Sequence, residues 1–322
     1  MTASAAARRS IAVSSGKTSP VGATLRAHPT LWLMRLLWLA MPWSVGAAAA
    51  DALVACSETS ARILSAELWA AWALVLTATL VRRPWALTVV RIAAPASVGV
   101  AIGAVVAAAA WDADLAAPRA AAAIAGAALA TAVALLPETG NSMVDGLSYG
   151  NERRMLLRTP FLLAVAPIPL VWAAVVAGIV APAVLWAIGQ WIWAVVVTVT
   201  GLAAAVLGFR SLHQLARRWV VFVPNGFVLH DRMATREPFL LRRADIASLG
   251  AAPADIDLAA DDLVDISGNA LGPVLLVALN GQVEVVPRTT GTAQVLSVSQ
   301  VLFSPTRPGE LLAEAARRRI PR

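Results

Sequence analysis

The stretch Trp191–Phe209 reads WIWAVVVTVTGLAAAVLGF and contains no charged side chain. An α-helix rises about 1.5 Å per residue, so roughly 20 such residues are enough to cross the hydrocarbon core of a bilayer. A charge-free apolar stretch of this length is typical of a transmembrane helix, whereas surface helices of soluble proteins carry polar residues on one face. The stretch therefore predicts that the chain is a membrane protein.

Five more stretches have the same character, and the composition of the whole chain agrees with them. Hydrophobic residues make up 59% of the sequence and charged residues only 14%, against about a quarter charged in soluble domains. The additional stretches are Leu36–Cys56, Ile63–Val81, Ile92–Ala110, Ala120–Leu136 and Phe161–Val180. We therefore expect six transmembrane helices within residues 31–217, preceded by a basic, disordered tail over residues 1–30.

Arginines near the ends of these stretches predict how the helices are oriented. Lys and Arg concentrate in the cytoplasmic loops of multi-pass membrane proteins. Alternate connections contain arginine clusters, such as Arg82–Arg83 and Arg153–Arg154, whereas the connections between them contain only Arg62 and Arg119. The arginine-rich side should be cytoplasmic, which places both termini in the cytoplasm and the protein in the inner or plasma membrane. The net charge of +7 then reflects loops near anionic lipid rather than nucleic-acid binding.

The first stretch has an alternative interpretation as a cleaved signal peptide, because three alanines precede Asp51 and a basic segment precedes the apolar run. Arg35 would then lie inside the apolar part of the signal peptide. An uncleaved first helix is therefore the favoured interpretation, and cleavage would leave the orientation of the other five helices unchanged.

From Arg218 onward, the long apolar stretches give way to short runs that suit β-strands. Two pairs of runs each flank an Asn-Gly dipeptide, the strongest local signal for a two-residue hairpin turn. The runs are Trp219–Val223 and Phe227–Leu229 around Asn225-Gly226, and Pro273–Leu279 and Gln282–Val286 around Asn280-Gly281. With further strands at Phe239–Leu241 and Val295–Phe303 and a helix after Pro308, residues 218–322 are expected to form a β-rich domain closed by a helix.

Residues 218–320 resemble the bacterial pleckstrin-homology-like (PH-like) domains found on membrane proteins. The resemblance is carried by Arg218-Trp219 at the first strand, Gly226–His230, Ala244–Ile246 and the helix start Pro308–Leu312. The whole chain is also similar to uncharacterised actinobacterial membrane proteins with Ser148–Arg154 between two spans. These resemblances imply a fold and a membrane location but no activity.

Within the PH-like family, lipid-binding members hold phosphoinositides with basic residues in the first hairpin loop. The corresponding loop here, Pro224–Gly226, carries no charge, so phosphoinositide binding is not expected. The bacterial members resemble protein-interaction or oligomerisation modules, and the resemblance therefore implies a protein partner in addition to the bilayer.

Residues 137–160, called the linker below, form the most polar connection between two expected helices. One interpretation is a basic loop that touches lipid headgroups. The sharper interpretation is a docking surface for the β-rich domain, which leaves the sixth helix on the same side. The residues expected to form this contact are Asp145 and Glu152 of the linker, the anchor Tyr149, and Arg232, Arg236, Arg242 and Arg243 of the domain.

Two carboxylates fall within the expected helices, where an ionisable group is a candidate for function. Asp51 lies near the outer end of the first helix and Glu67 about one turn inside the second. They could line a shallow polar cavity. The favoured interpretation is that Glu67 pairs with Arg62 or with the outer headgroups.

Motifs for catalysis and cofactor binding are weak. Residues Gly146–Gly150 match G-x-S-x-G, but a nucleophile elbow needs a strand before the serine and a helix after it, and a loop is expected here. Cys56 is the only cysteine, which excludes an intramolecular disulfide. The acidic run Asp255–Asp265 is expected to be a solvated loop. We therefore expect no catalytic residue, no metal and no cofactor.

These observations favour a membrane scaffold or accessory protein whose β-rich domain binds a partner protein. The alternative is a subunit of a small-solute transporter or channel. Transporters usually show repeated halves and charged or broken helices near the middle of the membrane. The sequence shows no convincing repeat, and the middle of its expected helices is nearly free of ionisable groups.

Overall fold

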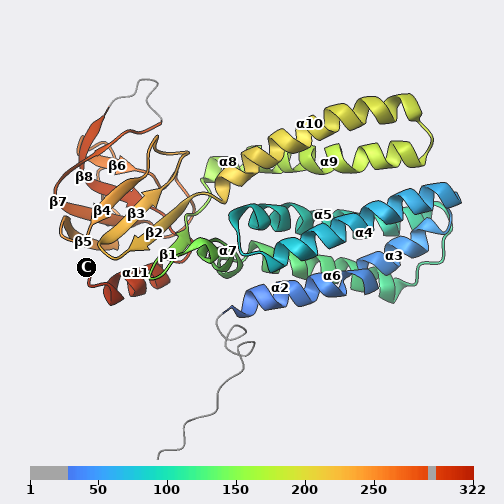
Figure 1. Cartoon of the computed structure of the whole chain (residues 1–322), viewed down its shortest axis with the longest axis horizontal. Helices are drawn as coiled ribbons and strands as arrows, with labels where there is room; N and C mark the ends of the chain where they lie inside the picture. Colours follow the sequence, from blue (N-terminus) through green and yellow to red (C-terminus); the bar gives the residue numbers. More distant parts are fainter. Residues whose placement is uncertain (1–27, 289–294) are drawn as a thin grey trace, which may run out of the picture.

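The computed structural model describes residues 28–288 and 295–322, in which a helical part lies beside a β-rich part (Figure 1). Within these residues, six helical segments are long and apolar enough to cross a membrane. They are Pro29–Leu53, Glu58–Leu80, Pro84–Ala110, Ala117–Leu135, Phe161–Ala187 and Trp191–Leu215. The expectation of six apolar helices is therefore confirmed. The expected tail lies outside the described residues, except for residues 28–30.

The first four segments form a helical bundle. Its elements are α2 (Pro29–Ala40), η1 (Met41–Trp43), α3 (Val45–Leu53), α4 (Glu58–Leu80), α5 (Pro84–Ala110) and α6 (Ala117–Leu135). Pro42 lies at the break between α2 and α3, as expected of a residue that cannot donate a backbone hydrogen bond. Trp38 of α2 and Trp72 of α4 join their helices reciprocally, because each indole Nε1 donates to the other residue's carbonyl oxygen, at 3.0 and 2.9 Å.

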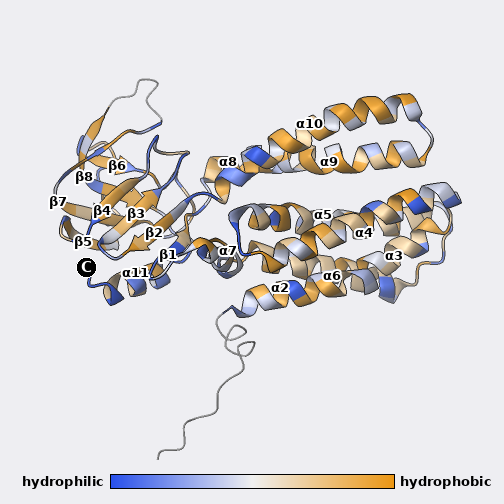
Figure 2. Ribbon diagram, in the orientation of Figure 1, coloured by the Kyte–Doolittle hydropathy of each residue, from blue (hydrophilic) through white to orange (hydrophobic). Residues whose placement is uncertain are grey.

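The last two segments form a separate hairpin of α8 (Phe161–Val165), α9 (Pro167–Ala187) and α10 (Trp191–Leu215). Figure 2 shows hydrophobic residues along both long helices, and only 6% of the most apolar window of Phe161–Ala187 is buried. Glycines let the two helices approach closely, since a Cβ on Gly178 or on Gly201 would collide with the other's backbone. Most of the hairpin surface is thus left for lipid.

Hydrogen bonds connect α9 of this hairpin to the bundle at two places along its length. The Ser60 hydroxyl of α4 donates to the Ala187 carbonyl oxygen at the end of α9, at 2.7 Å. The Trp172 indole of α9 donates to the Ile92 carbonyl oxygen of α5, at 2.9 Å. Since both acceptors are backbone carbonyls, the contacts fix the position of α9 without requiring a particular acceptor side chain.

The β-rich part contains two four-stranded sheets, with strand orders β1-β2-β3-β4 and β5-β7-β8-β6. The strands are β1 (Arg153–Leu156), β2 (Trp219–Val223), β3 (Gly226–His230), β4 (Phe239–Arg242), β5 (Ile246–Ala251), β6 (Leu263–Asp265), β7 (Leu275–Val285) and β8 (Leu296–Phe303). Helix α11 (Pro308–Arg317) follows the last strand, as expected. These strands and α11 are called the β domain below.

The β domain does not begin at Arg218, because its first strand comes from the linker. β1 pairs antiparallel with β2 over its whole length, from Arg153 opposite Phe222 to Leu156 opposite Trp219. Without β1, the β2 edge would carry unpaired backbone groups. The expected domain boundary is therefore corrected: the domain is assembled from residues on both sides of the α8–α10 hairpin.

The two Asn-Gly dipeptides have different outcomes. The first lies in a β2–β3 hairpin, as expected, although the two-residue turn is Pro224-Asn225 and Gly226 already pairs with Val223. Gly226 is required there because a Cβ would collide with the Leu241 carbonyl oxygen of β4.

The second Asn-Gly does not form a turn, so the expectation of a hairpin there is wrong. β7 continues through it as one strand, with an irregularity in its pairing to β8 between Ala278 and Val283. Asn280 donates two hydrogen bonds to the turn between β4 and β5. Its backbone N–H donates to the Asp245 carbonyl oxygen at 2.8 Å, and its side-chain amide donates to the Ala244 carbonyl oxygen at 3.2 Å. These contacts favour a β-bulge over a chain reversal.

The β1 and β2 strands of the first sheet are covered on both faces, and their side chains alternate between two cores. Met155 of β1 and Phe222 of β2 point into the core of the β domain. Their neighbours Leu156 and Val221 belong to the core of the helical bundle. Since successive side chains of a strand point to opposite faces, β1 and β2 form the layer that joins the helical part to the β domain.

Candidate functional site

The linker folds into α7 (Pro137–Val144), η2 (Asp145–Leu147) and β1, and lies between the bundle and the β domain. Pro137 occupies the first turn of α7, where a missing backbone N–H costs little. The Thr139 hydroxyl donates to the Val133 carbonyl oxygen at the end of α6, at 2.8 Å. Gly140 leaves room for the bundle, since a Cβ there would be 2.7 Å from Arg91 Nη2. Helix α7 is thus packed closely on the ends of the spanning helices.

Asn141 of α7 connects the linker to two parts of the β domain. Its side-chain oxygen accepts from the Leu156 backbone N–H of β1 at 2.8 Å and from the Thr306 hydroxyl, just before α11, at 3.3 Å. The residue is only 8% exposed. A buried amide with these two partners fixes the position of β1 relative to α7.

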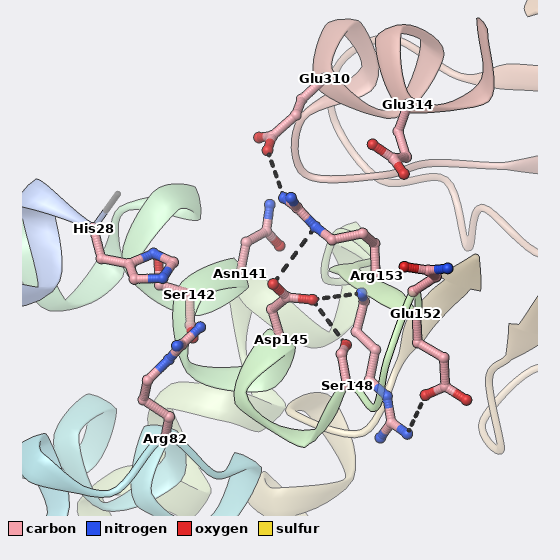
Figure 3. A network of polar contacts seen from close by, with 12 residues as sticks. His28, Arg82, Asn141, Ser142, Asp145, Ser148, Glu152, Arg153, Glu310 and Glu314 are labelled. Carbon is pink, nitrogen blue, oxygen red and sulfur yellow. Dashed lines mark hydrogen bonds and ion pairs between the residues drawn. The ribbon is translucent and has the colours of Figure 1, made fainter. Parts of the chain in front are cut away.

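A chain of charged groups extends from η2 to α11 (Figure 3). The Asp145 carboxylate accepts from the Ser148 hydroxyl at 2.8 Å and from the Arg154 backbone N–H at 2.9 Å. Arg153 lies between this carboxylate, at 3.5 Å, and Glu310 of α11, at 3.4 Å. Arg153 thereby connects the linker to α11.

A second ion pair also joins the linker to the start of α11. Arg307, next to α11, lies 3.4 Å from Glu138 of α7 and 2.7 Å from Glu310. Exposed pairs of this kind each contribute about 0–1 kcal/mol. They fix the orientation of the contact, whereas its burial provides most of the stability.

His28 and Arg82 bind the other side of α7. His28 Nδ1 lies 3.2 Å from the Ser142 hydroxyl, and Arg82 Nε donates to the Ser142 carbonyl oxygen at 2.9 Å. Burial, and then the positive charge of Arg82, lower the pKa of His28. The neutral imidazole is therefore favoured at this contact.

An open cleft of about 670 Å³ lies where the linker meets α11. Its lining includes five arginines, Arg153, Arg243, Arg317, Arg318 and Arg319, and two carboxylates, Glu152 and Glu314. Both carboxylates already have partners: Glu314 binds Arg317 at 3.1 Å and Arg318 at 2.7 Å, and Glu152 lies 3.4 Å from Arg154. The cleft therefore has a positive excess suited to an anionic group.

The linker and the β domain are in contact, but not through the expected residues. Tyr149 is 87% exposed, and its side chain has no hydrogen-bond or ring-contact partner in residues 28–288 and 295–322. Asp145 and Glu152 bind arginines of the linker itself. The four domain arginines, Arg232, Arg236, Arg242 and Arg243, are exposed and form no ion pair among the described residues. Backbone pairing of β1 with β2 takes the place of the expected charge contact. The pairing satisfies the backbone hydrogen-bonding groups of β1 and at the same time buries its apolar side chains.

The residues that carry this junction were missed at the sequence level. Asn141, Arg307 and Glu310 have no distinctive motif. One signal was present: Met155-Leu156-Leu157 is an apolar run inside a polar connection, and all three residues are buried. Such a run bounded by Pro160 is consistent with a short buried strand.

The two intramembrane carboxylates lie in different surroundings. Asp51 of α3 forms an ion pair with Arg119 of α6. Glu67 does not pair with Arg62, which instead binds Glu58 one turn away at 2.5 Å. Within the described residues, Glu67 has no hydrogen-bond or ion-pair partner. Glu67 follows Ser60 by seven positions, close to two helical turns, so it lies on the same face of α4 as Ser60, whose hydroxyl is bonded to the end of α9.

The G-x-S-x-G match lies outside the structural context of a nucleophile elbow. Ser148 follows η2 and precedes β1, and its hydroxyl donates to Asp145. His213 of α10 lies 3.0 Å from the Thr88 hydroxyl of α5 instead. Within the described residues, no group of three or more His, Cys, Asp or Glu side chains could hold a metal ion.

No protein-family model, no curated protein and no solved structure matches this chain.

Proposed function

We propose that the chain is a multi-pass scaffold or accessory protein of the cell membrane, with both termini in the cytoplasm, and that its β domain binds a partner protein without catalysing a reaction. The observation that carries the proposal is the arginine-lined cleft between the linker and α11. Two sheets closed by a C-terminal helix also support a PH-like domain, which serves as a binding module in the bacterial proteins that this segment resembles.

The cleft suits an acidic segment of the partner. Arginine presents several N–H donors in one plane, so it binds carboxylates in defined geometry. Gly150 and Asn151 supply backbone groups to the same cleft, and the exposed Tyr149 adjoins them. Aromatic and arginine side chains together are typical of the residues that dominate protein interfaces. Tyr149, whose exposed side chain has no hydrogen-bond partner in the part of the chain that the structure describes, is therefore assigned to contact with the partner.

The test is site-specific photo-cross-linking in native membranes. A benzoylphenylalanine at position 149 is expected to give one defined adduct, and Arg243→Glu with Arg319→Glu should abolish it. The matched control is Arg232→Glu with Arg236→Glu, which changes the charge equally outside the cleft. An adduct that survives both double variants, or the absence of any adduct, would contradict partner binding at the cleft.

The alternative, a subunit of a small-solute transporter or channel, is favoured by Glu67. A carboxylate without a partner inside a spanning helix is a candidate for cation or proton binding. Glu67 shares a face of α4 with Ser60, which is bonded to the α9–α10 hairpin. If purified protein in vesicles supports solute flux that Glu67→Gln abolishes and Glu58→Gln does not, this alternative replaces the scaffold proposal.

A further inference from the structure

The turn between β6 and β7, residues 266–274, exposes a large apolar side chain at a defined position. Leu271 is 71% exposed. Gly268 and Asn269 adopt left-handed backbone angles, with φ of +63° and +51°, and Gly272 has φ of +111°. The Ser267 backbone N–H donates to the Asp265 side chain at 2.7 Å. The turn is therefore well fixed, and Leu271 projects from it without covering the domain's own core.

The turn is attached to the segment where the chain reaches the α8–α10 hairpin. Arg158 of the linker donates from Nη1 to the Leu271 carbonyl oxygen and from Nε to the Pro305 carbonyl oxygen, the latter at 3.0 Å. Gly268 packs on Pro160, the residue before α8, since a Cβ at 268 would be 2.9 Å from the Pro160 ring. Leu271 is thus one arginine side chain away from the start of a spanning segment.

The depth of α8 follows from the length of α9. Helix α9 has 21 residues, which correspond to about 31 Å and match a hydrocarbon core of about 30 Å. The backbone breaks at Ala166, between α8 and α9. A placement in which α9 alone fills the hydrocarbon core would put α8, the first turn of the spanning segment, in the headgroup layer, which is about 5–7 Å thick on each side. Leu162 and Val165 of α8 are 74% and 60% exposed, as expected of side chains that contact lipid.

We propose that the Ser267–Gly272 turn inserts Leu271 into the headgroup layer beside α8, so that the β domain rests on the bilayer. The occupant assigned to Leu271 is lipid, because Gly268 of the same turn packs on Pro160, the residue that leads directly into α8 with its exposed Leu162 and Val165. Arg210, exposed near the end of α10, supplies a charge suited to anionic headgroups. This contact does not depend on the arginine-lined cleft or on a partner protein.

The test places an environment-sensitive nitrobenzoxadiazole label on single cysteines of the full chain, in a Cys56→Ser background, in nanodiscs containing phosphatidylglycerol. The position under test is Leu271→Cys. Leu162→Cys in α8 is the lipid-exposed reference. Asn225→Cys is the water-exposed reference, since it lies at the end of β2 remote from α10.

The label at 271 is expected to show blue-shifted emission and quenching by lipid with a nitroxide at carbon 5 of the acyl chain, as at 162, whereas the label at 225 shows neither. Emission at 271 equal to that at 225 would overturn the proposal. A blue shift without lipid quenching would also overturn it, because the side chain would then be covered by protein.

A second variant tests the attachment by Arg158. Gly272→Ala places a Cβ where it collides with Arg158 Nη1, at a φ that only glycine adopts easily. We expect lipid quenching at 271 to fall at least twofold. The matched control is Gly250→Ala, whose Cβ meets no atom within 4 Å. Unchanged quenching in Gly272→Ala would show that Arg158 does not position the turn.

Discussion

β1 and β2 are adjacent antiparallel strands, and the entire α8–α10 hairpin lies between them in sequence. The helical hairpin thus occupies the place of a β-hairpin turn. The ends of the two strands are close, since the Leu157 backbone N–H donates to the Arg218 carbonyl oxygen at 3.0 Å. A short turn should therefore replace the membrane hairpin without disturbing the β domain.

The perturbation replaces residues 159–216 with Asn-Gly and retains the chain from 137 onward. Asn-Gly is the preferred sequence of a two-residue hairpin turn. This hairpin-closed variant keeps α7, β1 and the complete first sheet. The matched comparison is the fragment 217–322, which begins one residue before the domain boundary expected from the sequence, Arg218, and lacks β1.

The cost of losing β1 and the residue that follows it comes from their buried side chains. Met155 and Leu157 are 2% and 5% exposed and belong to the core of the β domain. Each buried aliphatic side chain contributes about 1.5–3 kcal/mol, so the pair contributes about 3–6 kcal/mol. Because domains are stable by only about 5–15 kcal/mol, the fragment should lose much or all of its folding free energy.

The assay is urea unfolding followed by circular dichroism, for both proteins in the same mild detergent, which covers the α7 face that the bundle normally contacts. We expect one cooperative transition with a β-rich spectrum for the hairpin-closed variant. The fragment 217–322 should show a much lower midpoint or no transition. Equal midpoints would refute the conclusion that β1 is an integral part of the domain.

Three further predictions concern single contacts. Arg218→Ala should destabilise the chain by about 3–5 kcal/mol in urea unfolding, because it leaves Asp231 buried without the ion partner now at 2.6 Å, and the double variant with Asp231→Leu should recover most of that loss. Asn141→Ala should cost about 1–3 kcal/mol, since the buried Leu156 N–H loses its acceptor, whereas the exposed Asn225→Ala should change stability by less than about 0.5 kcal/mol. The lowered pKa of His28 contributes stability that is present above about pH 6.5, the pKa in the unfolded chain, and is lost as the pH falls through the folded pKa. Between pH 7.5 and 5.5, the melting temperature should therefore drop less in His28→Gln than in the unchanged protein. An equal drop in both would contradict a role for this imidazole.

The helical part could be predicted from the sequence because a spanning helix is a local pattern. The length of the apolar stretch determines such a helix, and neighbouring elements have little influence on it. For the fourth helix, the expected range was Ala120–Leu136 and the observed range is Ala117–Leu135, a difference of three residues at the start and one at the end. The first helix shows the limit of the pattern. It begins at Pro29, and Arg35 lies within it because its Nε donates to the Thr79 carbonyl oxygen of α4 at 3.0 Å.

The β domain could be predicted only where its pairing is local. The β2–β3 hairpin needs contacts a few residues apart, and a turn dipeptide indicates it. β1 needs a partner that lies beyond two spanning helices, so no local pattern indicates the pairing of Arg153 with Phe222. The same reason explains the misinterpreted Asn280-Gly281, whose geometry is decided by β8 and by the backbone of Asp245 rather than by its own turn preference.

The position of the cleft relative to these strands connects the proposed function to the fold. Residues 150–153 line the cleft and lead directly into β1, which continues through Pro160 into α8. The preceding helix, α7, is packed on the bundle through Gly140 and Ser142. An occupant of the cleft therefore contacts the one segment that is attached at one end to the four-segment bundle and at the other to the α9–α10 hairpin. Because both attachments are buried contacts, we propose that a partner bound at residues 150–153 also influences how the α9–α10 hairpin packs on the bundle.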